Sequence, residues 1–172
     1  YRNALRVLNM LNLTDLEGNW TGGDATLIQT GDIVDRGPFS TDILDLFARL
    51  KKQAKAVGGT IITLLGNHEL MAFIGEAKYV NSQEMEAFGG AEERFRAFSE
   101  GGRYGYLRKH PAVVLQRSTV FVHAGLAPWF ARMGVAGVNA LVHEAIANGA
   151  WGHRALNAFA DGPLWNRILI TE

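Results

Sequence analysis

Three side chains that could take part in chemistry each follow an apolar run of the sequence. Asp32, Asn67 and His123 come just after the runs ATLIQT, TIITLL and STVFV. Each lies within two residues of a glycine, which lets the backbone approach a ligand closely. Carboxylate, amide and imidazole groups all bind divalent metal ions in proteins. The sequence therefore offers oxygen and nitrogen donors at the ends of three expected strands.

Two of these runs predict a βαβ unit. Residues 25–30 and 60–65 are short, apolar and rich in β-branched side chains, as in the buried strands of a parallel sheet. Thr41–Val57 between them has helical spacing, with a buried stripe expected at Ile43, Leu46, Phe47 and Leu50. A right-handed crossover places both strand ends at the same edge of the sheet, where ligands bind in such folds. We therefore expect the loops after the two strands to converge.

The other elements are expected to support this unit. The spacing of apolar residues predicts a packing helix at 1–11, mainly helical structure at 71–106 that flanks or covers the site, a hairpin at 112–122, helical structure at 128–148 and an irregular stretch at 151–165. Phe95 and Phe98 are expected to point toward the core. The remaining histidines and the large aromatic side chains have no supporting pattern and are interpreted as packing or surface residues: His110, His143, His153, Phe73, Tyr79 and the four tryptophans.

Composition excludes several classes of function. Lys plus Arg and Asp plus Glu both number 17 in 172 residues, so no basic field favours nucleic acid or a membrane surface as a partner. There is no cysteine, which excludes a disulfide scaffold, a thiolate zinc site and a cysteine nucleophile. No apolar run approaches the roughly 18 residues of a membrane span, and the start YRNALRVLNM does not look like a signal peptide.

The motifs GDIVDRG, GNHE and HAGL, in this order, resemble the metal-binding motifs of the calcineurin-like metallophosphoesterases, in the phosphoprotein phosphatase branch. GNHELMAFIGEAKYV, FVHAGLAPW and DGPLWNR look most like the Shewanella-like protein phosphatases. The resemblance covers residues 22–167. It implies an α/β fold, the calcineurin-like metallophosphoesterase sandwich, with central sheets flanked by helices.

The same resemblance implies a centre of two divalent metal ions, with manganese, iron or zinc favoured over calcium by the mixed oxygen and nitrogen donors. Asp32 would bridge the two ions, while Asn67 and His123 would bind the second. Asn67 would also contact the substrate.

The catalytic roles follow from the resemblance as well. Asp35 and His68 look like the family's dyad, in which the aspartate orients an imidazole that protonates the leaving group or stabilises its developing charge. Arg36 fits bidentate phosphate capture, and Arg167 is a second candidate for phosphate binding or else a structural ion-pair partner. Glu69 is expected to tether a loop through hydrogen bonds.

These residues predict a phosphatase that hydrolyses phosphate monoesters of a protein or peptide by attack of a metal-bridging hydroxide. One alternative is a diadenosine tetraphosphatase-like hydrolase, because such enzymes also carry HAG. Another is a catalytically dead relic or binding module. The resemblance favours an intracellular protein, cytoplasmic or organellar with the chloroplast included, and not a secreted one. It specifies no regulatory subunit.

The first and last motifs of the family are missing from this stretch. An upstream Gly-Asp-x-His-Gly and a downstream Gly-His would supply three further ligands, and neither is present in residues 1–172. We therefore expect residues 1–172 to form one partial domain, incomplete at both ends. By itself it is expected to bind metals weakly and to hydrolyse little.

Overall fold

The computed structural model describes residues 1–157 and 161–167. Its centre is the predicted βαβ unit: strand β1 (Thr26–Gln29), helix α2 (Ser40–Ala56) and strand β2 (Thr60–Thr63). The two strands pair in parallel, with Thr26 opposite Thr60 and Gln29 opposite Thr63. Both strands are shorter than expected at their carboxyl ends, because the chain turns there into the loops that carry the motifs.

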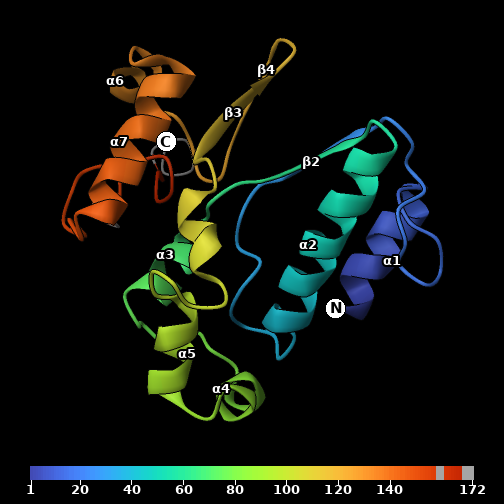
Figure 1. Ribbon diagram of the computed structural model, residues 1–172. Helices are drawn as coiled ribbons and strands as arrows, with labels where there is room; N and C mark the ends of the chain where they lie inside the picture. Colours follow the sequence, from blue (N-terminus) through green and yellow to red (C-terminus); the bar gives the residue numbers. More distant parts are fainter. Residues whose placement is uncertain (158–160, 168–172) are drawn as a thin grey trace.

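Helices α1 (Arg2–Met10) and α2 pack together against this strand pair (Figure 1). Their shared core is apolar and comprises Leu8, Leu46, Phe47, Leu50, Ala54 and Ile61. Three of the four residues predicted as the α2 stripe are buried, and Ile43 is half-buried. This packing fixes the strand ends from which the site is built.

Helix α3 (Asn67–Phe73) begins earlier than expected, inside the GNHE motif itself. The sequence predicted a break at Gly66–Glu69 and helical structure only from Met71. The Glu69 carboxylate accepts a hydrogen bond from the backbone N–H of Gly66 at 2.7 Å, which satisfies a free donor at the helix start. The motif residues are therefore held on a helix rather than on a loose turn.

The segment after α3 is helical, as expected, with α4 (Ser82–Phe88), α5 (Ala91–Phe98) and the short helix η1 (Gly105–Lys109). Phe98 is fully buried against Tyr104, with ring centroids 5.2 Å apart. The prediction for Phe95 was wrong, since 43% of this residue is exposed. It lies beside Gly75 at the surface, on the edge of α5 rather than on its buried face.

The predicted hairpin is confirmed as antiparallel strands β3 (Val113–Gln116) and β4 (Thr119–Val122). Two helices follow, α6 (Pro128–Ala131) and α7 (Gly134–Ala147), and the hairpin lies near them in Figure 1. The larger apolar core joins the hairpin and α7 to α3 and α5. In the described part of the chain, the strands form two separate two-stranded sheets, and no helix has the length and apolar character that crossing a membrane needs.

Candidate active site

The turn after β1 holds three charged side chains on strained backbone. Asp32, Asp35 and Arg36 have φ angles of +57°, +71° and +62°, in the left-handed region that non-glycine residues rarely occupy. Such conformations persist only where the surrounding structure fixes them, and they concentrate at functional sites. The strained turn of GDIVDRG is therefore the first place to look for chemistry.

Two glycines let this turn approach the start of α3. A Cβ atom on Gly31 would lie 2.5 Å from the backbone nitrogen of Gly66. A Cβ atom on Gly66 would lie 2.3 Å from Oδ1 of Asp32. Since real Cβ atoms are not found so close to other atoms, only glycine permits this contact. The expected convergence of the two strand ends is confirmed.

Glu69 ties the two loops together, as expected. Its buried carboxylate accepts the backbone N–H of Asp32 at 2.8 Å, that of Ile33 at 2.7 Å and that of Gly66 at 2.7 Å. Burial raises the pKa of Glu69, and the three backbone hydrogen bonds oppose that rise. Glu69 therefore fixes the backbone at Asp32 relative to the start of α3.

The three candidate metal ligands lie together. Nε2 of His123 is 2.8 Å from Oδ1 of Asn67 and 3.5 Å from Oδ2 of Asp32. Nδ1 of His123 donates to the carbonyl oxygen of Thr30 at 2.8 Å, which leaves Nε2 of the neutral ring with a free lone pair. Three side chains, from the turn after β1, the start of α3 and the loop after β4, thus meet at one point.

This arrangement fits a cation. In the neutral ring, Nε2 of His123 is an acceptor, and it faces a second acceptor, the amide oxygen of Asn67. A positive ion bound by both atoms, and by the carboxylate of Asp32, would satisfy them together. No cluster of three or more His, Cys, Asp or Glu side chains suited to a metal occurs within residues 1–157 and 161–167. The candidate set therefore depends on the amide of Asn67.

Asp35 and His68 form the pair that the resemblance implied. Oδ2 of Asp35 lies 2.7 Å from Nδ1 of His68, and both side chains are buried. An ionised carboxylate only accepts, so Nδ1 of His68 carries the hydrogen and Nε2 faces the site. Nη2 of Arg36 lies 3.4 Å from this Nε2, and Oδ2 of Asp32 lies 3.9 Å from it.

Tyr79 borders the same group. The centroid of its ring lies 5.3 Å from the centroid of the His68 ring. The guanidinium carbon of Arg36 lies 5.7 Å from the same Tyr79 centroid. The carbonyl oxygen of Tyr79 accepts the backbone N–H of Arg36 at 2.8 Å. Tyr79 is a packing residue as predicted, but it packs on the site, and 40% of it is exposed.

Two buried charged residues were missed by sequence reasoning. Arg94 of α5 and Glu84 of α4 are 2% and 1% exposed, and Nη2 of Arg94 lies 2.6 Å from Oδ1 of Asp35. One signal was present in the sequence, because Arg94 precedes Phe98 by four residues and so shares the buried face of the helix. Phe95 was placed on that face instead.

Arg167 is exposed, and its role in phosphate binding stays a prediction. The segment that carries it docks beside His123, because the backbone N–H of Ala124 donates to the carbonyl oxygen of Pro163 at 3.1 Å. Asn166 is buried against Gly125, where a Cβ atom would lie 3.2 Å from its side chain. The DGPLWNR and HAGL motifs are therefore neighbours.

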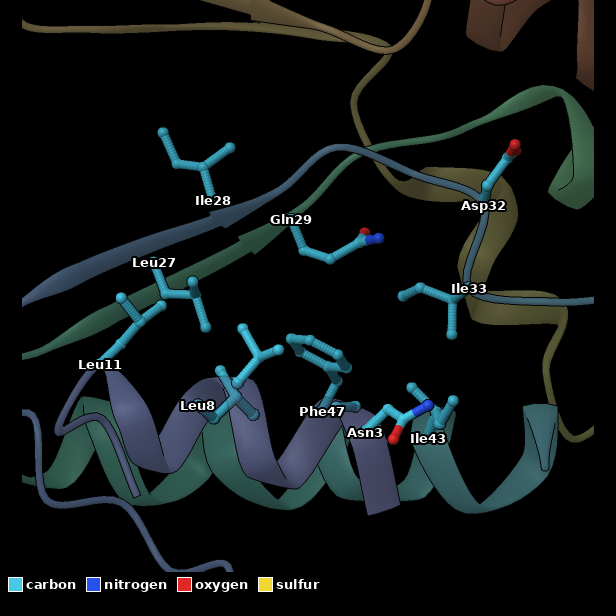
Figure 2. Close-up of a pocket in the computed structure, with 12 residues that line it drawn as sticks. Asn3, Leu8, Leu11, Leu27, Ile28, Gln29, Asp32, Ile33, Ile43 and Phe47 are labelled. Carbon is cyan, nitrogen blue, oxygen red and sulfur yellow. The ribbon is translucent and has the colours of Figure 1, made fainter. Parts of the chain in front are cut away.

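A cavity of about 420 Å³ lies on the other side of the turn. Figure 2 shows apolar side chains of α1, β1 and α2 along it, including Leu8, Leu27 and Phe47, with the Asp32 carboxylate pointing away from them. Its lining contains no lysine, arginine or histidine. The cavity is therefore unsuited to a phosphate group, and the candidate site is the polar group on the opposite face of the turn.

The site combines metal-binding donors at the ends of strands with an Asp–His pair and an arginine. This arrangement is expected of a metal-dependent hydrolase with an α/β fold. A model of the calcineurin-like phosphoesterase family matches residues 2–161. The chain therefore belongs to the calcineurin-like phosphoesterase family, as its motifs predicted.

The chain is also similar to individual proteins of several organisms. An uncharacterized protein of Schizosaccharomyces pombe is 34% identical, over 98% of this chain and 54% of its own length. Shewanella-like protein phosphatase 2 of Arabidopsis thaliana is 37% identical, over 51% of this chain and 22% of its own. Bis(5'-nucleosyl)-tetraphosphatase (symmetrical) of Proteus mirabilis is 27% identical, over 74% of this chain and 41% of its own.

A solved structure confirms the fold class. The crystal structure of a cold-active protein-tyrosine phosphatase of a psychrophilic Shewanella species matches the chain with a TM-score of 0.88 and 27% identity. The match covers 100% of this chain and 55% of that one. The chain thus spans about half the length of the fission yeast relative and of this phosphatase.

Proposed function

We propose that this chain carries the site of a metal-dependent phosphoprotein phosphatase that hydrolyses phosphate monoesters. One observation supports this most directly. Nε2 of His68 lies 3.4 Å from the guanidinium of Arg36 and 3.9 Å from the carboxylate of Asp32. A proton donor, a phosphate-binding cation and a candidate metal ligand therefore surround a single point, which is what transfer of a phosphoryl group to water requires.

The metal centre is the family's shared feature, since calcineurin-like phosphoesterases use a dinuclear centre. Asp32, Asn67 and His123 are the residues of this chain that would hold metal. When bound, the metals lower the pKa of water and neutralise phosphoryl charge. Oxygen and imidazole donors favour manganese, iron or zinc, and we propose one of these.

The remaining steps belong to side chains. Arg36 can bind two phosphoryl oxygens with its planar guanidinium, which a lysine could not do in the same geometry. His68 presents Nε2 toward the site, and in the imidazolium form, in which both ring nitrogens carry hydrogen, it can give the Nε2 proton to the leaving oxygen. Asp35 accepts the Nδ1–H of His68 and so holds the ring in that orientation. Asn67 and Arg167 are proposed as further substrate contacts.

The substrate proposed is a phosphorylated protein or peptide. The support comes from the names of the relatives, a Shewanella-like protein phosphatase and a protein-tyrosine phosphatase. The second candidate is a dinucleotide polyphosphate, because the bis(5'-nucleosyl)-tetraphosphatase of Proteus mirabilis is also similar, over 74% of the chain. Both substrates suit the same metal site, so the choice between them is a matter for experiment.

The test uses the full-length gene product, stripped of metal with a chelator and reloaded with Mn²⁺. Hydrolysis rates are compared on phosphotyrosine, phosphoserine and phosphothreonine peptides and on diadenosine tetraphosphate. We expect phosphopeptide hydrolysis that disappears with the chelator and returns with Mn²⁺. The variant His123→Ala should lower kcat/KM at least about 10²-fold, as loss of a ligand that places the metal implies.

His153→Ala is the matched control, because His153 accepts the backbone N–H of Ala155 outside the candidate site. It should hydrolyse phosphopeptide like the wild type. Faster hydrolysis of diadenosine tetraphosphate than of every peptide would replace the proposal by its alternative. No metal-dependent turnover of either class would contradict both.

A further inference from the structure

The Asp35–His68 pair is held from the helical segment that follows it. Arg94 on α5 contacts the Asp35 oxygen that His68 leaves free, and its side chain is 2% exposed. We infer that Arg94 is a positioning residue, which fixes the Asp35 carboxylate and through it the orientation and tautomer of His68. The inference rests on the proposed function of His68 as the proton donor.

Both oxygens of Asp35 are occupied. Oδ1 accepts from Nη2 of Arg94 at 2.6 Å, and Oδ2 lies 2.7 Å from Nδ1 of His68. The Asp35 side chain is 1% exposed, so water does not compete for these oxygens. Two strong contacts on opposite oxygens leave the carboxylate plane little freedom to rotate. Arg94 therefore determines where the acceptor of the His68 Nδ1–H lies.

Arg94 is itself held by two further contacts. Its Nε lies 3.3 Å from Oε1 of Glu84, and its guanidinium carbon lies 5.1 Å from the ring centroid of Phe98. The other oxygen of Glu84 accepts the backbone N–H of Ser40 at 3.3 Å. The hydroxyl of Ser40 accepts the backbone N–H of Asp35 at 3.2 Å. Asp35, Arg94, Glu84 and Ser40 therefore form a closed ring of contacts.

The closed ring explains how a strained residue is kept in place. Asp35 has a φ of +71°, which costs free energy unless its surroundings impose it. The ring joins the turn after β1, the start of α2, α4 and α5, so four segments hold one carboxylate. If the Arg94 ion pair had only a structural role, it would not need to include Asp35, the residue that orients the imidazole of His68.

A role in leaving-group protonation predicts a dependence on the leaving group. Phenyl phosphate releases a basic phenolate that needs a proton, whereas p-nitrophenyl phosphate releases a stabilised anion that needs one far less. Arg94→Met should therefore lower kcat on phenyl phosphate about 10²-fold, the lower end of what general-acid catalysis contributes, with little change on p-nitrophenyl phosphate. KM should stay within about twofold on both, because Arg36 still binds the phosphate.

Arg94→Lys keeps the charge but presents one ammonium group instead of a fork, so it should restore part of the loss. Arg108→Met is the matched control. Arg108 donates to the carbonyl oxygens of Phe98 and Phe73 and packs on Phe73, in the same helical region but without contact to Asp35. If Arg108→Met gives the same loss, or if Arg94→Met slows both substrates equally, the inference is wrong. Should Arg94→Met fail to fold, the ratio of the kcat values on the two substrates, measured in Arg94→Lys, decides whether the inference holds.

A second readout does not require activity. Long-range ¹H–¹⁵N spectra of the full-length gene product report which ring nitrogen of His68 carries the hydrogen. For the neutral form of the ring we expect a single Nδ1–H tautomer in the wild type and in Arg108→Met, and a mixture of tautomers in the Arg94 variants. An unchanged spectrum in those variants would overturn the inference. If the wild type hydrolyses neither substrate, the proposed function fails, and this spectrum alone decides the role of Arg94.

Discussion

Glu69 connects the two loops of the site without being a candidate catalyst. Its carboxylate is 1% exposed and accepts three backbone N–H groups, two of them from the turn that carries Asp32. A carboxylate can accept several hydrogen bonds at once, whereas an amide offers one acceptor oxygen and two donors. Glutamine is therefore nearly the same size but chemically wrong at this position.

Glu69→Gln should lower the free energy of unfolding by about 2 kcal/mol, because at least one buried N–H loses its acceptor. It should also weaken Mn²⁺ binding about tenfold, the usual effect of losing a group that orients a metal ligand. Urea unfolding and titration calorimetry measure the two effects. Glu76→Gln is the control, since Glu76 also accepts a backbone N–H, from Lys78, but at the surface. Equal results for both variants would show that Glu69 does not position Asp32.

At the scale of elements, the site depends on how closely the turn after β1 approaches the start of α3. Gly66 has an ordinary φ of −111°, so an alanine could adopt its backbone conformation. However, the Cβ of an alanine at position 66 would lie 2.3 Å from Oδ1 of Asp32, which is too close for the two atoms. The glycine of GNHE is therefore required by the neighbouring segment and not by its own conformation.

Gly66→Ala is expected to push Asp32 out of place and to reduce Mn²⁺ affinity about tenfold or more. The strain should also lower the free energy of unfolding by about 1–3 kcal/mol. Gly37→Ala is the matched control, because Gly37 lies in the same turn and a Cβ there would meet no atom within 4 Å. Unaltered metal affinity in Gly66→Ala would argue that Asp32 is not a ligand.

For the whole molecule, a polar cluster around His110 joins four elements. Thr63 of β2 contacts Nδ1 of His110 at 3.0 Å and accepts from Lys51 of α2 at 2.7 Å. His143 of α7 donates to the carbonyl oxygen of His110, which follows η1, at 2.8 Å. Burial, followed by the charges of Lys51 and His143, lowers the pKa of His110 from 6.5 to about 3.

This lowered pKa makes the fold sensitive to acid. Between pH 6.5 and about 3 the unfolded chain binds a proton at His110 and the folded chain does not, so stability falls as the pH falls through this window. By pH 4.5, two units below the pKa of the unfolded chain, the loss from this group should be about 2–3 kcal/mol relative to pH 7.5. His110→Asn should flatten the dependence of the unfolding free energy on pH by that amount.

Urea unfolding of wild type and variant from pH 7.5 to 4.5 measures the slope. The comparison at pH 7.5, where His110 is neutral in both states, gives the cost of lost packing separately. Parallel curves for the two proteins would show that His110 does not carry the acid sensitivity.

Much of this architecture was predictable because the signals are local. The βαβ unit and the hairpin follow from short apolar runs and from helical spacing, which are properties of neighbouring residues. The convergence of the loops with Asp32 and Asn67 follows from the parallel order of β1 and β2. Two local predictions were wrong, the start of α3 and the burial of Phe95, because capping by Glu69 and the rotation of α5 depend on contacts between segments.

The sequence by itself determined which residues could do the chemistry and along which edge they would meet. Only the tertiary structure decided how they are held. Arg94 lies 59 positions from Asp35, and its spacing from Phe98 indicates a place on the buried face of α5 but not the partner that it meets there. A charged side chain is buried only where partners from other segments are buried with it, and that depends on the packing of α4 and α5 against the turn. Spacing along the chain contains no information of this kind, so the ring of Asp35, Arg94, Glu84 and Ser40 appears only in three dimensions.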